Sequence, residues 1–88
     1  MLEIQITKQF KKDYARVTKR GKNLSKIKQV ILLLEQGKEL PAKYKDHALT
    51  GNYAHSRDCH IEPDWLLIYN ISGDIITLER TGTHSDIF

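Results

Sequence analysis

The chain has 88 residues, of which 40% are hydrophobic and 28% charged, a composition typical of one small globular domain spanning residues 1–88. It contains no apolar run of the roughly 18 residues that cross a membrane, and its first residues lack the basic and apolar regions of a signal peptide. Cys59 is the only cysteine, which excludes an internal disulfide and fits a reducing compartment. We therefore expect a cytoplasmic protein with a thin core and no membrane contact.

The net charge of +3 conceals an uneven distribution along the chain. Residues 1–45 contain 12 Lys or Arg against 4 Asp or Glu, whereas residues 46–88 contain 2 against 7 and all four histidines. The first half therefore indicates a binding surface for a polyanion, and the second half a chemical site. From charge alone, a merely solvated helix surface explains the lysines equally well.

Hydrophobic periodicity predicts a strand and two helices in the first half. Residues 2–6 alternate between apolar and polar side chains, which indicates a short strand with one buried face. A helix is expected from about residue 8 to 20, with Thr7 as its cap, and a second from about 24 to 36. The short break at residues 21–23 predicts an antiparallel helix hairpin.

The second half is typical of an antiparallel meander. A loop is expected over residues 38–52, and three strands are expected over residues 53–61, 65–71 and 75–81. Residues 84–88 form a short tail. The order of strand, helix, helix and a meander of three or four strands predicts an α+β fold with both helices on one face of the sheet.

Arg80 conflicts with simple alternation in the last predicted strand. It has the same parity as Ile76 and Leu78, so an ideal strand would direct it toward their face. A bulge, or the strand end itself, would redirect the side chain.

Four histidines and a cysteine raise the possibility of a metal site, because both residue types are common ligands. His55 and Cys59 fall on one side of a predicted strand but about 13 Å apart, too far to share one ion. The sequence contains no C-x-x-C or H-x-x-x-H spacing, and no G-x-S-x-G, P-loop or dinucleotide-binding motif. We therefore expect neither a metal nor a cofactor.

Metal-free RNA cleavage suits the remaining titratable residues. RNA carries its own nucleophile, the 2′-OH, so cleavage requires a base, a cation near the phosphate and an acid for the leaving 5′-oxygen. The candidates are His47, His60, Asp64 and His84 for proton transfer, Arg80 for phosphate binding, and Trp65, Tyr53 and Phe88 for stacking on a base. Each has a structural alternative, because single histidines and strand-opening tryptophans are more often structural.

Three sequence blocks make the interpretation more specific. They occur in order as residues 44–51 (YKDHALTG), 57–69 (RDCHIEPDWLLIY) and 79–84 (ERTGTH), and Phe88 follows. Together they resemble the YafQ-type toxins of the RelE/ParE toxin superfamily, whose strand–helix–helix–meander layout is similar to nearly the whole chain. Cys59 departs from the small residue expected at its position, and we expect it to pack inward.

The resemblance implies an endoribonuclease that cuts mRNA in the ribosomal A site and is inhibited by a co-expressed antitoxin protein. It implies an active-site set of His47, His60, Asp64, Arg80 and His84. Trp65 and Phe88 would place the substrate, and Lys8, Lys12 and Lys19 would contact ribosomal RNA. The antitoxin would place acidic and apolar segments against the same basic surface. We expect His84 and Asp64 as the first pair for proton transfer, with His60 and His47 as proton partners or substrate positioners. Which residue acts as base and which as acid stays open.

Two other functions stay open at this point. One is a non-catalytic toxin of the same superfamily that acts on a topoisomerase by protein contact and has no need of the histidines. The other is an RNA-binding module that uses the basic helices and aromatic residues without chemistry. The three histidines at motif positions favour the nuclease.

Overall fold

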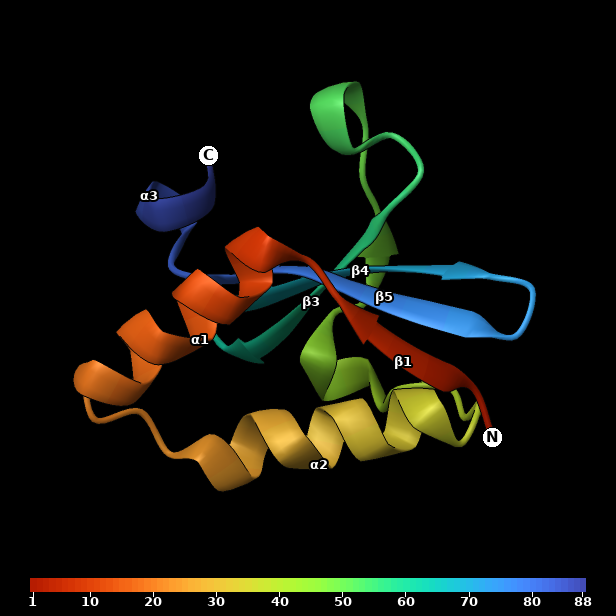
Figure 1. Ribbon diagram of the computed structural model, residues 1–88, viewed down its shortest axis with the longest axis horizontal. Coiled ribbons are helices and arrows are strands. Elements are labelled where there is room, and N and C mark those ends of the chain that lie inside the picture. Colours follow the sequence, from red (N-terminus) through yellow and green to blue (C-terminus); the bar gives the residue numbers. More distant parts are fainter.

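The computed structural model describes residues 1–88 as one sheet with two long helices packed against it (Figure 1). The helices and strands, in chain order, are β1 (Glu3–Ile6), α1 (Lys8–Lys19), α2 (Leu24–Glu35), β2 (His47–Ala48), β3 (Arg57–Glu62), β4 (Trp65–Ser72), β5 (Ile75–Gly82) and α3 (His84–Ile87). Two short 3₁₀ turns lie between α2 and β3, namely η1 (Ala42–Tyr44) and η2 (Gly51–Tyr53).

The five strands follow the order β1-β5-β4-β3-β2. β1 pairs parallel with β5, and the strands from β2 to β5 pair antiparallel with their neighbours. This confirms the predicted α+β fold, with four strands in the meander. The helix predictions are also confirmed, because α1 and α2 begin at the predicted residues and end within one residue of the predicted ends.

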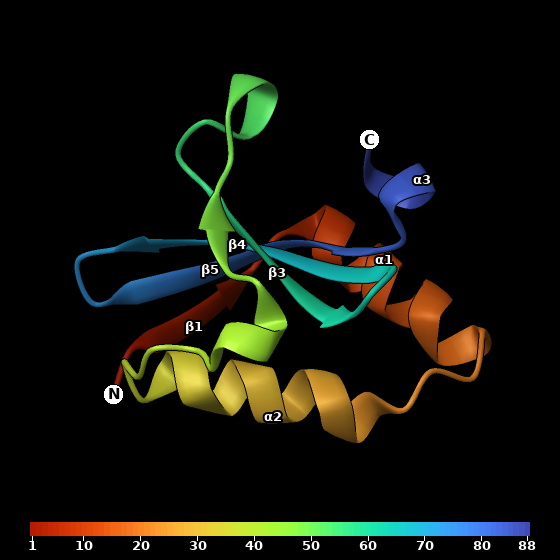
Figure 2. The ribbon, with the colours of Figure 1, turned by 180° about the vertical axis from the view of Figure 1, so that it is seen from behind.

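Two apolar clusters lie on opposite faces of the sheet. α2 runs beneath the sheet in Figure 1 and α1 packs beside β5, an arrangement also visible from behind in Figure 2. The main cluster fills this side and consists of Phe10, Val17, Ile27, Val30, Leu34, Tyr44, Cys59, Ile61, Trp65, Leu67, Tyr69, Ile76 and Leu78. On the other face, where α3 and η2 rise, the small cluster is Leu66, Ile68 and Ile87, with Leu49 and Tyr53 against it.

The structure corrects three local predictions. β3 begins at Arg57 instead of residue 53, because the turn η2 starts at Gly51, whose φ of +68° favours glycine. β2 lies in the predicted loop, where a two-residue strand leaves no periodic signal. α3 occupies the predicted tail, and it begins with a capping box between Thr83 and Asp86.

A bulge in β5 resolves the conflict over Arg80. Leu78 pairs with Tyr69, whereas Arg80 pairs with the adjacent Ile68, so Glu79 is an extra residue in the ladder. Leu78 therefore faces the main core. Arg80 shares the opposite face with Ile68, the face on which α3 lies.

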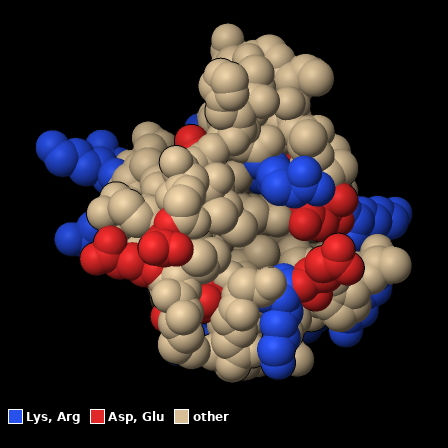
Figure 3. All heavy atoms as spheres, turned by 90° about the vertical axis from the view of Figure 1, so that its right-hand side faces the viewer, with Lys and Arg blue, Asp and Glu red and all other residues tan.

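The turn between β4 and β5 points away from α3. On the side toward which this turn points, acidic and basic side chains are interspersed among uncharged ones (Figure 3). The opposite end of the same strands, where β5 leads into α3, carries the residues of the candidate site. No helix combines the length and apolar character that a membrane crossing requires.

Candidate active site

Antiparallel pairing brings Asp64 and His84 together. Asp64 lies in the two-residue turn between β3 and β4, and His84 follows the end of β5, so both lie at the same edge of the sheet. His84 Nδ1 lies 2.5 Å from Asp64 Oδ1, and the His84 backbone N–H donates to the same oxygen at 2.9 Å. These hydrogen bonds from the backbone and side chain of His84 hold the pKa of Asp64 below its usual value. Asp64 is therefore an ionised group that orients the imidazole and leaves Nε2 open to substrate.

Pairing between β2 and β3 places His47 and His60 around one carboxylate. His47 lies opposite Asp58, and His60 follows two residues later on the same face. The two Nε2 atoms lie 3.7 and 3.8 Å from Asp58 Oδ2. The Nδ1 atoms lie 2.8 Å from the Lys45 carbonyl and 3.3 Å from the Pro63 carbonyl, respectively. When Nδ1 donates to these carbonyls, each Nε2 is free to exchange a proton.

The three imidazoles form one row, which we call the histidine row (His47, His60 and His84). Ring centroids are 6.1 Å apart between His47 and His60, and 5.6 Å apart between His60 and His84. His60 is the middle member, and its side chain is 19% exposed, against 52% for each of the other two. A phosphate at this row would have more than one proton donor or acceptor beside it.

Asp58 is buried beneath the histidine row without full hydrogen bonding. Its side chain is 5% exposed, and Oδ1 has no hydrogen-bond partner. Burial raises the pKa of Asp58, an effect that His60, His47 and His84 oppose only in part. The Asp58 carboxylate therefore lies against the histidine row with hydrogen-bonding capacity to spare.

His47, Asp58 and His60 together provide a possible metal site, which their spacing along the chain did not indicate. One ligand atom each from His47, Asp58 and His60 lie within 4.8 Å of one another. Two imidazoles and a carboxylate are donors that suit zinc or copper. His47 lies on β2, whereas Asp58 and His60 lie on β3, so no spacing within a single strand indicates this group.

Arg80 is held rigidly by the buried Asp13. Arg80 Nε donates to Asp13 Oδ2 at 2.7 Å, and Nη2 donates to Oδ1 at 3.3 Å and to the Asp86 carbonyl at 3.2 Å. Burial acts to raise the pKa of the fully buried Asp13, but hydrogen bonds from Arg80, Gln9 and the Thr81 N–H lower it overall. Hydrogen bonds to Asp13 and to Tyr53 raise the pKa of Arg80, so the fixed guanidinium stays charged, and no carboxylate hydrogen-bonds to its Nη1.

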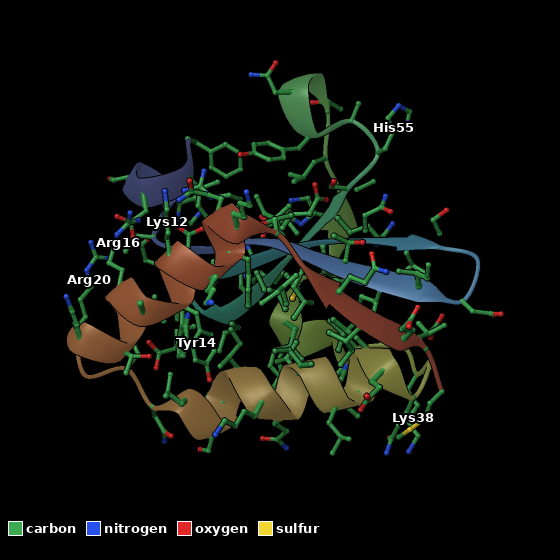
Figure 4. The ribbon with its side chains drawn as sticks, in the orientation of Figure 1. Lys12, Tyr14, Arg16, Arg20, Lys38 and His55 are labelled. Carbon is green, nitrogen blue, oxygen red and sulfur yellow. The ribbon has the colours of Figure 1, made fainter.

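Asp86 fastens α3 to α1. Arg20 donates to its two carboxylate oxygens at 2.6 and 3.1 Å, and the Thr83 backbone N–H donates to Oδ2 at 2.9 Å. Hydrogen bonds from Arg20 and Thr83 hold the pKa of Asp86 far below its usual value. Gly82, at φ +148°, has no room for a side chain, because a Cβ would lie 2.7 Å from Asp86 Oδ2. Figure 4 shows Arg20 on the side of α1 nearest α3.

Most of the predicted site residues converge on this end of the sheet. The histidine row, Asp64 and Arg80 lie on one face, where Arg80 and His84 are linked through α3. Phe88 follows α3 directly and is 63% exposed, with its ring edge-on to Tyr53 at a centroid distance of 5.9 Å. These two aromatic rings could form a platform for a base.

Trp65 does not fit the role expected for it. Its side chain is only 1% exposed in the main core, and Nε1 donates to Thr81 Oγ1 at 2.9 Å. No face of the indole is open for stacking on a base, so Trp65 supports the sheet from within. Cys59 packs inward as expected, and burial raises the pKa of its thiol.

The lysines expected to bind RNA lie exposed on α1. Lys8, Lys12 and Lys19 form no salt bridge with a carboxylate. Lys12 extends on the side of α1 nearest α3, in line with Arg16 and Arg20 (Figure 4). Lys12 therefore adds an unpaired positive charge beside the salt bridges of Arg16 and Arg20 with Asp86.

Three acidic residues of the site were missed from the sequence: Asp13, Asp58 and Asp86. Asp13 had a signal, because it falls between Phe10 and Val17 on the buried stripe of α1, where an acid requires a partner. Asp58 had one as well, because alternation places it on the same strand face as His60. The partners of these three acids come from distant segments of the chain, and no local sequence pattern indicates them.

Comparison with known proteins agrees with this geometry. The family model described as the YafQ bacterial toxin of type II toxin–antitoxin systems matches residues 2–88. The mRNA interferase toxin YafQ of Escherichia coli K12 is 42% identical over 87 residues, which cover 98% of this chain and 95% of that protein.

Solved structures show the same fold. The E. coli DinJ–YafQ complex contains a chain that matches with a TM-score of 0.92 and 42% identity, with 100% of this chain and 99% of that chain covered. A copper-bound mutant toxin from Helicobacter pylori matches with a TM-score of 0.95 and 38% identity, with both chains covered completely. The chain therefore belongs to the YafQ family of bacterial toxins of type II toxin–antitoxin systems.

Proposed function

We propose that the chain is a metal-independent endoribonuclease that cuts mRNA, in the ribosomal A site, and is neutralised by a cognate antitoxin. The observation that carries the proposal is the histidine row beside Arg80, which offers proton-transfer groups and a fixed cation on one face. The E. coli relative is named an mRNA interferase and has been solved with DinJ, which supports the same substrate and an antitoxin partner here. These names also disfavour a topoisomerase target.

Cleavage uses the 2′-OH of the RNA as the nucleophile. A base in the histidine row removes its proton, the 2′-oxygen bonds to phosphorus, and the bond from phosphorus to the 5′-oxygen breaks. An acid in the row protonates the departing 5′-oxygen, which leaves a cyclic 2′,3′-phosphate and a 5′-OH. We pair His84 with His60 for these transfers in place of Asp64, because hydrogen bonds from His84 lower the pKa of Asp64 and keep it ionised. The rings of His84 and His60 are neighbours, and each has Nε2 free.

The remaining residues set charge and position. Arg80 stabilises the charge that grows on the phosphate, because its guanidinium is already fixed by Asp13 and needs no reorganisation. Asp64 orients His84. His47 shares Asp58 with His60 and acts as its proton partner or positions the substrate. The exposed lysines of α1 contact ribosomal RNA.

Site-directed variants test the proposal on translating ribosomes. His84→Ala and His60→Ala should each slow message cleavage by about 10²–10⁴-fold, the usual contribution of a positioned acid or base. His55→Ala is the matched control, because His55 lies on the protruding segment after η2, apart from the site (Figure 4). Cut sites are mapped by primer extension on message from ribosomes incubated with each folded variant. Wild-type cleavage by both His84→Ala and His60→Ala would exclude the mechanism.

Metal independence has its own test. A zinc-selective chelator at fixed Mg²⁺ should leave the cleavage rate unchanged. Added Zn²⁺ should inhibit, because an ion held by His47, Asp58 and His60 would occupy the proton-transfer nitrogens. Loss of cleavage on chelation, with rescue by Zn²⁺, would instead make this group a catalytic metal site.

A further inference from the structure

A cationic cavity adjoins the histidine row. It has a volume of about 400 Å³, within the range of small-ligand sites, and His60 forms part of its wall. Three lysines line it from two elements, Lys26 on α2 and Lys43 and Lys45 at η1. The cavity is therefore continuous with the site described above.

Two of these lysines are available to bind an anion. Lys26 Nζ pairs with Glu62 at 2.8 Å, and Lys22 pairs with the other oxygen of the same carboxylate at 2.9 Å. Lys43 and Lys45 have no carboxylate partner, and Lys43 Nζ lies over the Tyr44 ring, 5.1 Å from its centroid. Because Glu62 is already matched by two lysines, the free charge of the cavity is positive.

The backbone at Lys45 connects the cavity to the histidine row. Lys45 has φ +50° and ψ +43°, a left-handed conformation that is uncommon for residues other than glycine. In this conformation Lys45 lines the cavity, while its carbonyl lies 2.8 Å from His47 Nδ1. One residue therefore belongs to the cavity wall and also holds a member of the histidine row.

We propose that this cavity binds a backbone phosphate of the mRNA next to the phosphate that is cut. The proposal rests on the proposed nuclease function. RNA carries a phosphate at every nucleotide, so a strand whose scissile phosphate lies at His60 must pass its neighbouring phosphates close to the wall that His60 forms. Lys43 and Lys45 supply the cations, as point charges that tolerate any base sequence. The cavity thus positions the RNA strand without recognising its base sequence.

The first test compares two double variants that remove the same charge. Lys43→Gln/Lys45→Gln should raise the toxin concentration for half-maximal cleavage about tenfold at physiological salt, and should reduce the salt slope of binding by about 1.4, or 0.7 per lost single-strand contact. The rate at saturation should change less than about twofold. Lys28→Gln/Lys38→Gln is the control, because both lysines are exposed and neither lines the cavity, and it should behave as wild type.

The second test identifies the phosphate. Messages carry one uncharged methylphosphonate linkage, either immediately 5′ or immediately 3′ of the cut. One of the two should weaken wild-type cleavage about tenfold and have little effect on Lys43→Gln/Lys45→Gln, since paired changes at one contact are not additive. Lys43→Gln alone, which leaves the Lys45 backbone untouched, should show about half of the effect on a logarithmic scale.

Three outcomes would overturn the proposal. The first is a half-maximal concentration for Lys43→Gln/Lys45→Gln equal to that of wild type. The second is equal sensitivity of this variant and wild type to every methylphosphonate. The third is an equal loss of binding to ribosomes without message, which would assign the lysines to ribosomal RNA. If wild type cuts and His84→Ala does not, any of these results removes the cavity proposal alone; if wild type does not cut, the nuclease proposal itself fails.

Discussion

The two sides of the candidate site are held in opposite ways. On the anchored side, which we define as Arg80, His84, Asp13, Asp64 and Asp86, side chains hydrogen-bond to one another or to Arg20 at distances of 2.5–3.3 Å. On the open side, which we define as His47, Asp58 and His60, the two Nε2 atoms lie 3.7 and 3.8 Å from Asp58 Oδ2, and Asp58 Oδ1 has no hydrogen-bond partner.

This difference suggests that the two sides have different roles in catalysis. Groups that stabilise charge work best when their dipoles are fixed in advance, as on the anchored side. Groups that exchange protons need spare hydrogen-bonding capacity, and the open side has it. On the anchored side His84 is the exception, because Asp64 engages its Nδ1 and leaves Nε2 for proton transfer. The comparison predicts that changes on the anchored side reduce stability together with activity, whereas changes on the open side separate the two.

The largest expected effect on stability is that of Asp13→Ala. It leaves the Arg80 guanidinium, 17% exposed, without its partner, and breaking such a buried pair costs about 3–5 kcal/mol. Urea unfolding at pH 7 measures the change. Asp74→Ala, in the exposed turn between β4 and β5, is the control and should change stability by less than about 0.5 kcal/mol. A loss below about 1 kcal/mol in Asp13→Ala would show that the pair does not anchor this side.

Arg80→Lys should come next, with its main effect on the rate. An ammonium keeps the charge but cannot reach Asp13, the Asp86 carbonyl and a phosphate at once, since it lacks the planar fork. Cleavage at saturation should fall by about 10²-fold, the scale of one lost charge-stabilising donor. Rates on ribosome-bound message measure this. A rate within threefold of wild type would mean that Arg80 acts only as a structural partner of Asp13.

Local patterns predicted the helices, and pairing between distant segments decided the rest. The apolar stripes of α1 and α2 repeat every turn, so the sequence alone determined both helices. The blocks around His60 and Arg80 indicated the chemistry. The bulge at Glu79 and the two-residue strand β2 depend on partner strands, which no local pattern shows. α3 could have been predicted, because Thr83 and Asp86 have capping-box spacing.

Asp86→Asn tests the anchored side with a smaller expected loss of stability. The folded-state pKa of Asp86 lies below its ordinary value of 3.8, so its ion pairs contribute stability above that pH and lose it as pH falls toward the folded pKa. Because Arg20 is 43% exposed, we expect a loss of only about 1 kcal/mol at pH 7. Urea unfolding should show the gap between variant and wild type closing below about pH 4. A gap that stays constant with pH would exclude the charge as its cause.

Asp58→Asn should change stability in the opposite direction. Burial raises the folded-state pKa of Asp58, so its ionised form costs stability at pH 7, and the cost disappears as pH falls below the ordinary value of 3.8. An amide of the same shape removes the charge, and we expect a gain of about 0.5–1 kcal/mol at pH 7, near the lower end of the range for a buried unpaired polar group. Urea unfolding at pH 7 and in acid measures the gain and its decline.

Cleavage by Asp58→Asn should fall even as stability rises. The variant removes the charge of the carboxylate that lies 3.7 and 3.8 Å from the Nε2 atoms of His47 and His60, so the two rings lose the charged group that they share. Single-turnover cleavage of ribosome-bound message at pH 7 measures the fall, and Asp74→Ala is the control that should cut at the wild-type rate. A less stable Asp58→Asn protein that cuts at the wild-type rate would mean that Asp58 is a structural residue and that the open side is held as firmly as the anchored one.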